Sequence, residues 1–300
     1  MIMMLLVAFR FNWMICKMAL TNNPNKTRRI EKQWNDEIDL RWSKFWIEFE
    51  KIPLEKLVLN IDDQDQFNID EFLFSFSSLA MQILLGGDNG AWQNKYQTLA
   101  YERSAERTIE TMKASLTTEQ ILFLSAIIGA QVTSFLPENR NELNFLHKRA
   151  NDSLTKWITS LIQEVNIITH DSFHKVSKEQ LINRISNRLS VSKSRARVIA
   201  TTEVAQASQR AVTTQAKIMA EVLDTEVNVR WITMNDSVVR HLHANWHGEI
   251  FTPEQAETNF NISPWNCRCG LMPILKRDES QKTKERFAKE RKFLLAGERR

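Results

Sequence analysis

The sequence predicts an α+β fold that is mostly α: long amino-terminal helices, then a small α+β domain with a few short strands. Seven glycines and six prolines in 300 residues are too few for the many turns of a strand-rich sandwich or barrel. Apolar residues recur at three- and four-residue spacing as far as residue 220, which is typical of amphipathic helices. Strand-like alternation is found only beyond residue 223.

The helical region is divided by turn-forming residues and by polar stretches. A capping box, Thr117 with Gln120, begins one helix, and Pro137 is expected to close it. Loops or turns are expected at 54–70, 86–90 and 169–177. The expected helices span residues 28–51, 71–85, 91–115, 117–135, 141–168, 178–189 and 192–220.

The first of these helices, over 28–51, carries an aromatic face with three tryptophans, Trp34, Trp42 and Trp46. Two interpretations are open. The face is buried in a helical core, or it is a docking surface for a partner.

In the carboxy-terminal part, Val227, Val229 and Trp231 alternate with polar residues, as in a half-buried strand. Asp236 is a good N-cap for a short helical turn, and Gly248 allows a left-handed exit from that turn. The expected elements are a strand at 226–233, a helical turn at 237–247 and a closing strand at 271–275.

Composition and cysteine usage indicate a globular protein of a reducing compartment. Apolar residues make up 43% and charged residues 25%, which excludes wholesale disorder. The three cysteines, Cys16, Cys267 and Cys269, cannot form a disulfide framework. The unbroken apolar run at the start, nine residues long, falls short of the ~20 that a membrane span needs. Residues 1–17 are interpreted as an upstream start-site extension or an apolar arm, with a targeting segment as a third interpretation.

Basic residues gather in two places. The tail, residues 276–300, holds ten Lys/Arg against five Asp/Glu, a net +5 in a chain whose total is +4. One interpretation is a solvated helix, and the other is a contact with DNA phosphates or an acidic partner. The candidate contact residues are Arg184, Arg188, Lys193, Arg195, Arg197, Lys282, Lys284, Lys289, Arg291 and Lys292.

Two segments place charged or metal-binding side chains in unusual surroundings. In the first, 195–211, Glu203 lies on an alanine-lined helix, where a buried carboxylate needs an Arg, a backbone donor or a metal as partner. The second, 231–269, contains four candidate metal ligands: His243, His247, Cys267 and Cys269.

The residues of these segments follow one ordered pattern, made up of Arg195, Ala196, Ile199, Ala200, Thr202, Glu203, Trp231, Asp236, Val239, Arg240, His243, Gly248, Asn266, Cys267, Arg268 and Cys269. In this order and spacing, the pattern resembles the phage Mu F family, the head morphogenesis or minor head proteins of tailed phages. The resemblance covers roughly residues 180–275. Thr201 departs from it, since the family usually has Arg there, and so does Pro264-Trp265, where many members place a His before the Asn.

The resemblance implies a structural role rather than catalysis. Such a protein is a low-copy component of the procapsid and virion, associated with the portal and with major capsid or scaffold proteins. It contributes to head assembly, DNA packaging or DNA ejection, with non-specific contact to double-stranded DNA and no membrane. The implied location is the phage head interior, after assembly in the bacterial host cytoplasm.

The His/Cys group allows two interpretations. Thiolate and imidazole ligands suit a structural zinc ion, although Cys-x-Cys is less usual for zinc than Cys-x-x-Cys. Alternatively, the thiols are buried apolar groups and His243 bonds Asp236 or a backbone carbonyl. A buried polar network is then expected, formed by Glu203, Asp236, Arg240, His243 and Arg268. If its Arg268 pair is buried, Arg268→Ala would cost roughly 2–4 kcal/mol.

Two other functions compete with the structural role. The first is a metal-dependent hydrolase or nuclease using His243, His247 and Asp236, and the second is a free-standing DNA-binding protein. The expected organisation is an extension at 1–17, a helical domain at 18–177, a Mu F-like domain at 178–275 and a basic tail at 276–300.

Overall fold

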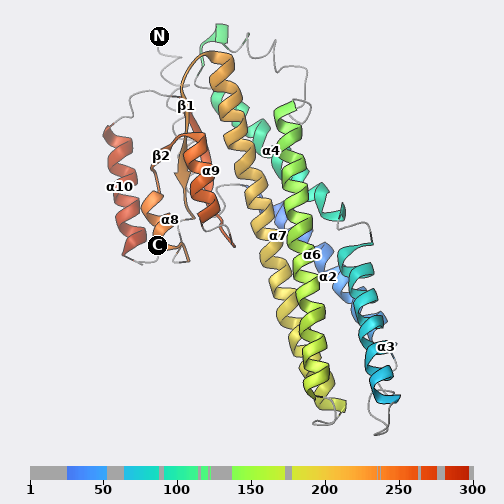
Figure 1. Ribbon diagram of the computed structural model, residues 1–300. Coiled ribbons are helices and arrows are strands. Elements are labelled where there is room, and N and C mark those ends of the chain that lie inside the picture. Colours follow the sequence, from blue (N-terminus) through green and yellow to red (C-terminus); the bar gives the residue numbers. More distant parts are fainter. Residues whose placement is uncertain are drawn as a thin grey trace. The chain divides into compact units, whose positions relative to one another are not determined.

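The computed structural model confirms a mostly helical α+β fold, in which the described strands form one small antiparallel sheet (Figure 1). It describes residues 26–52, 64–87, 91–113, 116–120, 122, 137–172, 178–234, 236, 238–262, 265–275 and 281–296. The chain forms two compact units that interleave along the sequence. The helical unit comprises Glu31–Lys95 and His147–Ala200, and the mixed unit comprises Met1–Ile30, Tyr96–Leu146 and Thr201–Arg300.

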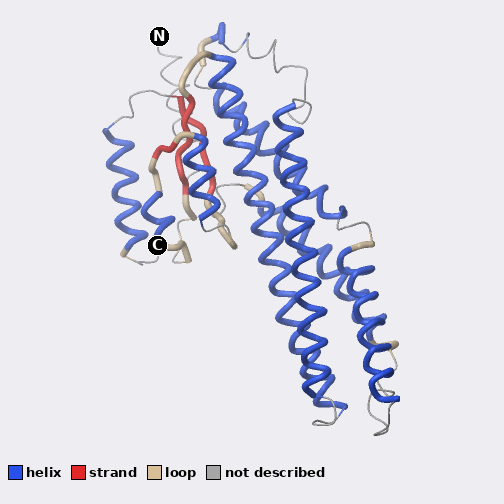
Figure 2. Tube along the Cα trace, viewed as in Figure 1, coloured by secondary structure: helices blue, strands red, loops and turns tan. Residues whose placement is uncertain are grey.

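Helices dominate the described chain, and all of the described strands lie in the mixed unit (Figure 2). Four helices, α2, α4, α6 and α7, contribute residues to both units. The helical elements before the sheet are α2 (Arg28–Phe49), α3 (Gln64–Leu79), the π-helical η2 (Ala80–Leu85), the 3-10 turn η3 (Ala91–Gln93), α4 (Asn94–Lys113), α6 (Pro137–Ser172) and α7 (Lys178–Leu223).

The aromatic face of α2 forms the core of the helical unit. Trp42 stacks on Trp157 of α6 at 6.1 Å between ring centroids, and Phe45 meets Phe76 of α3 edge to face at 5.6 Å. Trp34 and Trp42 are at most 3% exposed. The core interpretation of this face is therefore confirmed for these residues, because buried rings cannot offer a docking surface.

Helix α7 is one continuous helix of 46 residues, so the predicted break between residues 189 and 192 is wrong. No glycine or proline interrupts it, and the buried positions Leu189, Ser192 and Ala196 keep the helical spacing through the expected break. Ser192 is held from α6, since Trp157 Nε1 donates to its hydroxyl at 2.8 Å. Tertiary packing thus overrides the weak helix propensity of this stretch.

Other helix boundaries also differ from the expected ones. Helix α3 begins at Gln64, inside the loop predicted for 54–70, and α6 begins at Pro137 because proline fits the first turn of a helix. The capping box is confirmed: Gln120 N–H donates to the Thr117 hydroxyl at 3.3 Å, and Thr117 N–H donates to the Gln120 side chain at 3.1 Å. Most of the helix predicted after it, and residues 1–17, lie outside the described residues.

The sheet has the strand order β2-β1-β3, with both pairings antiparallel. Its strands are β1 (Val227–Ile232), β2 (Ile250–Phe251) and β3 (Gly270–Leu275). Val229 of the central strand lies opposite Phe251 on one side and Pro273 on the other. The two predicted strands are confirmed, whereas the two-residue β2 had no recognisable sequence pattern.

Helices cover both faces of this sheet (Figure 1). Val227, Val229 and Trp231, the predicted inward face, pack in one cluster with residues of α7 and of α9 (Pro253–Ile262). On the opposite face, the Arg230 guanidinium lies 4.7 Å from the ring centre of Phe287 in α10 (Gln281–Leu295). The sheet therefore lies between an apolar helical layer and the basic carboxy-terminal helix.

Helix α9 was not predicted, although its sequence carries a start signal. Thr252 and Gln255 form a capping box, in which the Gln255 N–H donates to the Thr252 hydroxyl at 3.3 Å and the Thr252 N–H donates to the Gln255 side chain at 3.0 Å. Pro253 then occupies the first helical position. The turn-forming residues around this segment indicated a loop instead of a helix.

Among the described helices, none combines the length and low charge needed to cross a lipid bilayer.

Candidate functional site

The second half of α7 has a buried face that is rich in polar side chains and is directed at α4. Glu203 is fully buried, and Gln97 Nε2 donates to its carboxylate at 3.4 Å. Farther along, Ser104 of α4 and Ser208 of α7 form a hydrogen bond of 2.8 Å. Because each of these buried groups has a partner on the facing helix, the bonds fix how α4 and α7 align.

The segment that carries the cysteines docks on this same half of α7. The backbone N–H of Asn266 donates to the Thr202 hydroxyl at 2.8 Å. Gln209 Nε2 donates to the Cys269 carbonyl at 2.6 Å. The two segments that the motifs singled out, far apart in sequence, therefore lie side by side.

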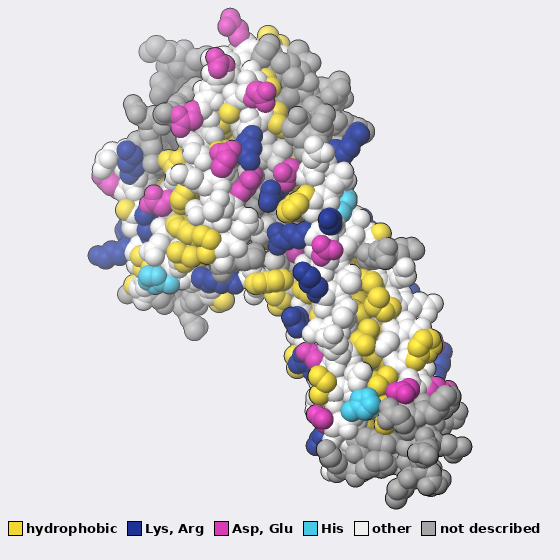
Figure 3. Space-filling model, in the orientation of Figure 1, with side chains coloured by type: hydrophobic (Ala, Val, Ile, Leu, Met, Phe, Trp, Pro, Cys, Tyr) yellow, Lys and Arg dark blue, Asp and Glu magenta, His cyan; other side chains and the backbone are white. Residues whose placement is uncertain are grey.

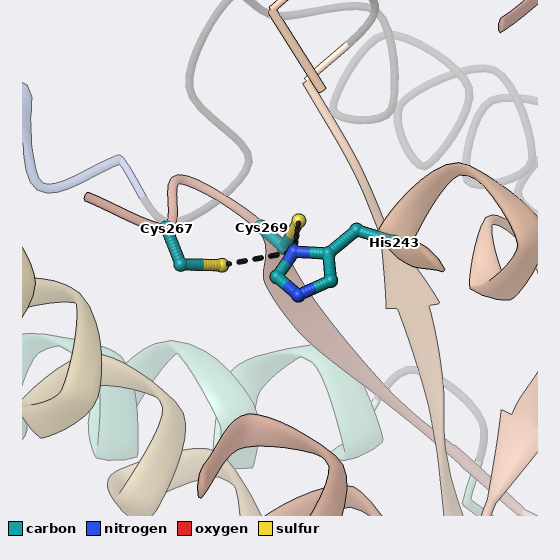
Figure 4. A group of neighbouring side chains, drawn as sticks. All are labelled: His243, Cys267 and Cys269. Carbon is teal, nitrogen blue, oxygen red and sulfur yellow. Dashed lines mark hydrogen bonds between the residues drawn. The ribbon is translucent and has the colours of Figure 1, made fainter. Parts of the chain in front are cut away.

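His243, Cys267 and Cys269 form a compact buried cluster at this junction (Figure 4). His243 comes from α8 (His241–Trp246), and the two cysteines come from the segment that leads into β3. His243 Nδ1 lies 3.5 Å from each sulfur atom, and the three candidate ligand atoms all lie within 4.8 Å of one another. Each side chain is at most 4% exposed. This is the donor set that could hold a metal ion.

A pocket of about 270 Å³ adjoins the cluster. His243, Cys267 and Cys269 form part of its wall, so the buried cluster has one side on a cavity. The other lining residues are Met234, Val238, Val239, Arg240, Asn266 and Arg268.

The two thiols are electrostatically unequal. A hydrogen bond from Cys269 lowers the pKa of Cys267 to about 5, although burial opposes the change and His243 adds to it. The same hydrogen bond, together with burial, raises the pKa of Cys269. The surroundings thus favour the thiolate form of Cys267 and disfavour that of Cys269.

His247 does not join this cluster. Its Nδ1 accepts the backbone N–H of Thr233 at 3.1 Å, and its Nε2 lies 3.0 Å from the Glu290 carboxylate of α10. Helix α8 begins at His241 rather than at 237 and ends before His247, so the expected shared helical face with His243 is not formed. Among the described residues, the only group of three or more close candidate ligands is His243, Cys267 and Cys269.

Asp236 also lies outside the cluster. Its carboxylate accepts the backbone N–H of Val238 at 3.1 Å and forms an ion pair with Arg268 at 3.0 Å. It therefore caps a turn instead of beginning α8, whose N-cap residue is Arg240. The ligand set of the hydrolase alternative, His243 with His247 and Asp236, is not assembled.

The predicted polar network is divided over several places. Glu203 bonds Gln97 at the α4 interface, whereas Asp236 and Arg268 pair with each other. Arg240 donates to the backbone carbonyl of Trp265, and His243 faces the cysteines rather than Asp236. Among the described contacts, the five residues thus do not form one network around a single buried charge.

Arg268→Ala is expected to lower the free energy of unfolding by about 0.5–1 kcal/mol, because an ion pair that water reaches on one side contributes little. Arg268 and Asp236 are 33% and 34% exposed, so the 2–4 kcal/mol that applies to a buried pair is too large. Urea unfolding followed by circular dichroism would measure the loss. A cost above about 2 kcal/mol would contradict this view of the pair.

The basic residues of α7 are partly neutralised by acids from neighbouring helices. Asp39 of α2 pairs with Lys193 at 2.9 Å and with Arg197 at 2.7 Å, and Glu164 of α6 pairs with Arg188. Arg184 donates to the Ser172 hydroxyl at 2.9 Å, and Arg195 is exposed.

In α10 the candidate contact residues divide into one paired arginine and four exposed lysines. Arg291 pairs with Glu249, which precedes β2. The exposed residues are Lys282, Lys284, Lys289 and Lys292. Figure 3 shows positive and negative side chains interspersed over the visible face, without one large positive patch.

Three functionally placed residues escaped the sequence reasoning. Met234 and Val238 line the pocket beside the cluster, and Glu290 holds His247 from 43 residues away. Their local sequences carry no ligand-like spacing, and only the fold brings Met234 and Val238 to the pocket and Glu290 to His247.

Comparison with known proteins yields one match. The family model described as Phage Mu protein F like protein matches residues 176–272, about a third of the chain. Neither the curated proteins nor the solved structures contain a significant match. The matched segment holds all of α7, the strands β1 and β2, the first half of β3 and the His/Cys cluster. The resemblance predicted from the motifs is thereby confirmed: residues 176–272 are similar to the Phage Mu protein F like family.

Proposed function

We propose that the protein is a phage minor head protein: a low-copy, non-catalytic component of the procapsid and virion. The observation that carries the proposal is the family match over residues 176–272, together with the convergence of its motif residues at one junction. There the backbone N–H of Asn266 donates to Thr202, and Gln209, on the same helix as Thr202, donates to the Cys269 carbonyl. A module held together in this way is suited to keeping its shape inside an assembly.

The finer role is association with the portal, with a contribution to head assembly, DNA packaging or ejection. It rests on the Mu F resemblance. The burial of Trp34 and Trp42 in the helical core removes those residues as the contact surface. The portal would have to engage other parts of the chain.

Contact with packaged DNA is a minor part of the proposal. The exposed lysines of α10 are the strongest candidates, because the Arg188, Lys193 and Arg197 side chains are held by acids. Phosphate binding by such lysines is sequence-independent and weakens steeply as salt rises.

The test is to co-express the full-length protein with the portal protein of the same phage and to purify through a tag on the portal. We expect co-elution that survives moderate salt, and we expect peptides of the protein in DNA-filled heads at far fewer copies than the major capsid protein. An unrelated tagged protein of similar net charge is the control. Absence from both procapsids and virions would refute the role, and co-elution that the control reproduces would refute specific portal association.

A further inference from the structure

We propose that His243, Cys267 and Cys269 bind one zinc ion, which joins α8 to the segment that precedes β3. The fourth coordination position of this ion faces the adjoining pocket and is filled by solvent. This site is independent of the proposed role in the phage head, because it rests only on the arrangement of the described side chains.

The spacing of the donor atoms fits tetrahedral zinc. Bond lengths of ~2.3 Å to sulfur and ~2.0–2.1 Å to nitrogen, at a tetrahedral angle, place a sulfur and a nitrogen ligand about 3.5 Å apart. Nδ1 of His243 lies 3.5 Å from Cys267 Sγ and 3.5 Å from Cys269 Sγ. Both pairs therefore already have the separation that a shared ion requires, and Nδ1 is the nitrogen that faces the sulfurs (Figure 4).

The chemistry of the donors selects the ion. Two thiolates and an imidazole are soft to borderline ligands, which favour zinc over magnesium or calcium. No carboxylate belongs to the cluster within the described part of the chain. Arg240 and Arg268 line the neighbouring pocket but cannot ligate, because a guanidinium offers no acceptor.

The position of the cluster gives the ion a structural task. Helix α8 has only six residues, and the cysteines lie in a stretch without helix or strand. His243 is separated from Cys267 by 24 residues and from Cys269 by 26. An ion bound by residues of both segments would hold the short helix and the Cys segment together. The site adjoins Trp231 of the core, whose ring lies 5.5 Å from that of His243.

The open coordination position follows from the pocket. Structural zinc sites usually have four protein ligands, whereas a site with three protein ligands keeps one position for water. The pocket of about 270 Å³ borders all three ligand residues and has room for solvent. A small anion or thiol could therefore reach the ion from that side.

Metal content tests the site directly. The full-length protein, carrying a tag without histidines and kept reduced, is expected to contain one zinc per chain by mass spectrometry of the elements. Cys267→Ser and Cys269→Ser are expected to lose at least nine-tenths of that zinc. Two matched controls, His241→Gln on the exposed part of α8 and Cys16→Ser, should keep it.

A measurement on the unaltered protein covers the case in which these variants do not fold. Chelation of the metal should lower the melting temperature, and zinc should restore it. Folded, reduced protein that takes up no zinc when zinc is in excess would overturn the proposal and leave a hydrogen-bonded thiol pair. Loss of zinc from the Cys16→Ser or the His241→Gln variant would also overturn the proposal.

Cobalt in place of zinc tests the geometry. Tetrahedral cobalt with two thiolates should give strong visible bands and a sulfur-to-metal charge-transfer band. Added azide or a small thiol should shift these bands if the fourth position is open to the pocket. Octahedral-type weak bands, or a spectrum that neither reagent changes, would contradict the coordination proposed here.

Discussion

Replacing Trp231 by alanine is expected to lower the free energy of unfolding by about 3–5 kcal/mol, the usual cost of removing a large buried aromatic side chain. Its ring is fully buried on the central strand, stacks on Phe260 of α9 at 4.6 Å and meets Trp246 of α8 edge to face at 5.0 Å. Alanine would leave a cavity in the centre of the mixed unit. Urea unfolding followed by far-ultraviolet circular dichroism measures the loss.

Trp265 offers the matched control for this prediction. It is 53% exposed, so Trp265→Ala should change the stability by no more than about 0.5 kcal/mol. Trp231→Phe should lie between the two, because it keeps most of the stacking on Phe260. Equal effects of Trp231→Ala and Trp265→Ala would show that the core is not centred on the sheet.

Substitution of Gly248 by alanine is expected to cost about 2–5 kcal/mol, which combines a left-handed backbone with overpacking. Gly248 has φ +82°, and a Cβ there would lie 2.5 Å from the Cβ of Phe287. The methyl group could fit only if Phe287, and α10 with it, moved away from the sheet. Besides the lower stability, trypsin should therefore cleave within α10 faster than in the wild type.

Gly87→Ala separates the two causes. Gly87 also has a left-handed backbone, with φ +67°, but nothing lies within 4 Å of its missing Cβ. Its substitution should therefore cost only the backbone part, about 1–2 kcal/mol, and leave cleavage in α10 unchanged. If the two substitutions had the same effect, close packing of Phe287 on Gly248 would be excluded.

The sequence was a good guide wherever one periodicity governed a whole element. The aromatic stripe of α2 and the alternation of Val227, Val229 and Trp231 both became buried faces, because burial of one face is what such patterns encode. The sequence was a poor guide where contacts between distant residues determine whether a helix continues or ends. The continuity of α7 depends partly on Trp157 of α6 holding Ser192, which no local pattern reports.

The candidate site, too, was predicted in part. His243, Cys267 and Cys269 were identified from residue type and spacing, and the structure brings them together. His247 was grouped with them because it follows His243 by four residues, but α8 ends at Trp246. Beyond the helix the chain turns at Gly248, and His247 is directed to Glu290 of α10. Helical spacing predicts neighbours only as far as the helix extends.

The two edges of the sheet have a consequence for aggregation. A long free edge is a template on which further chains can add strands and aggregate. Here one edge strand, β2, has only two residues, and the other, β3, contains Pro273, which has no N–H to donate. Neither edge offers an unbroken row of donors and acceptors, so copies crowded together have little means of polymerising through their sheets.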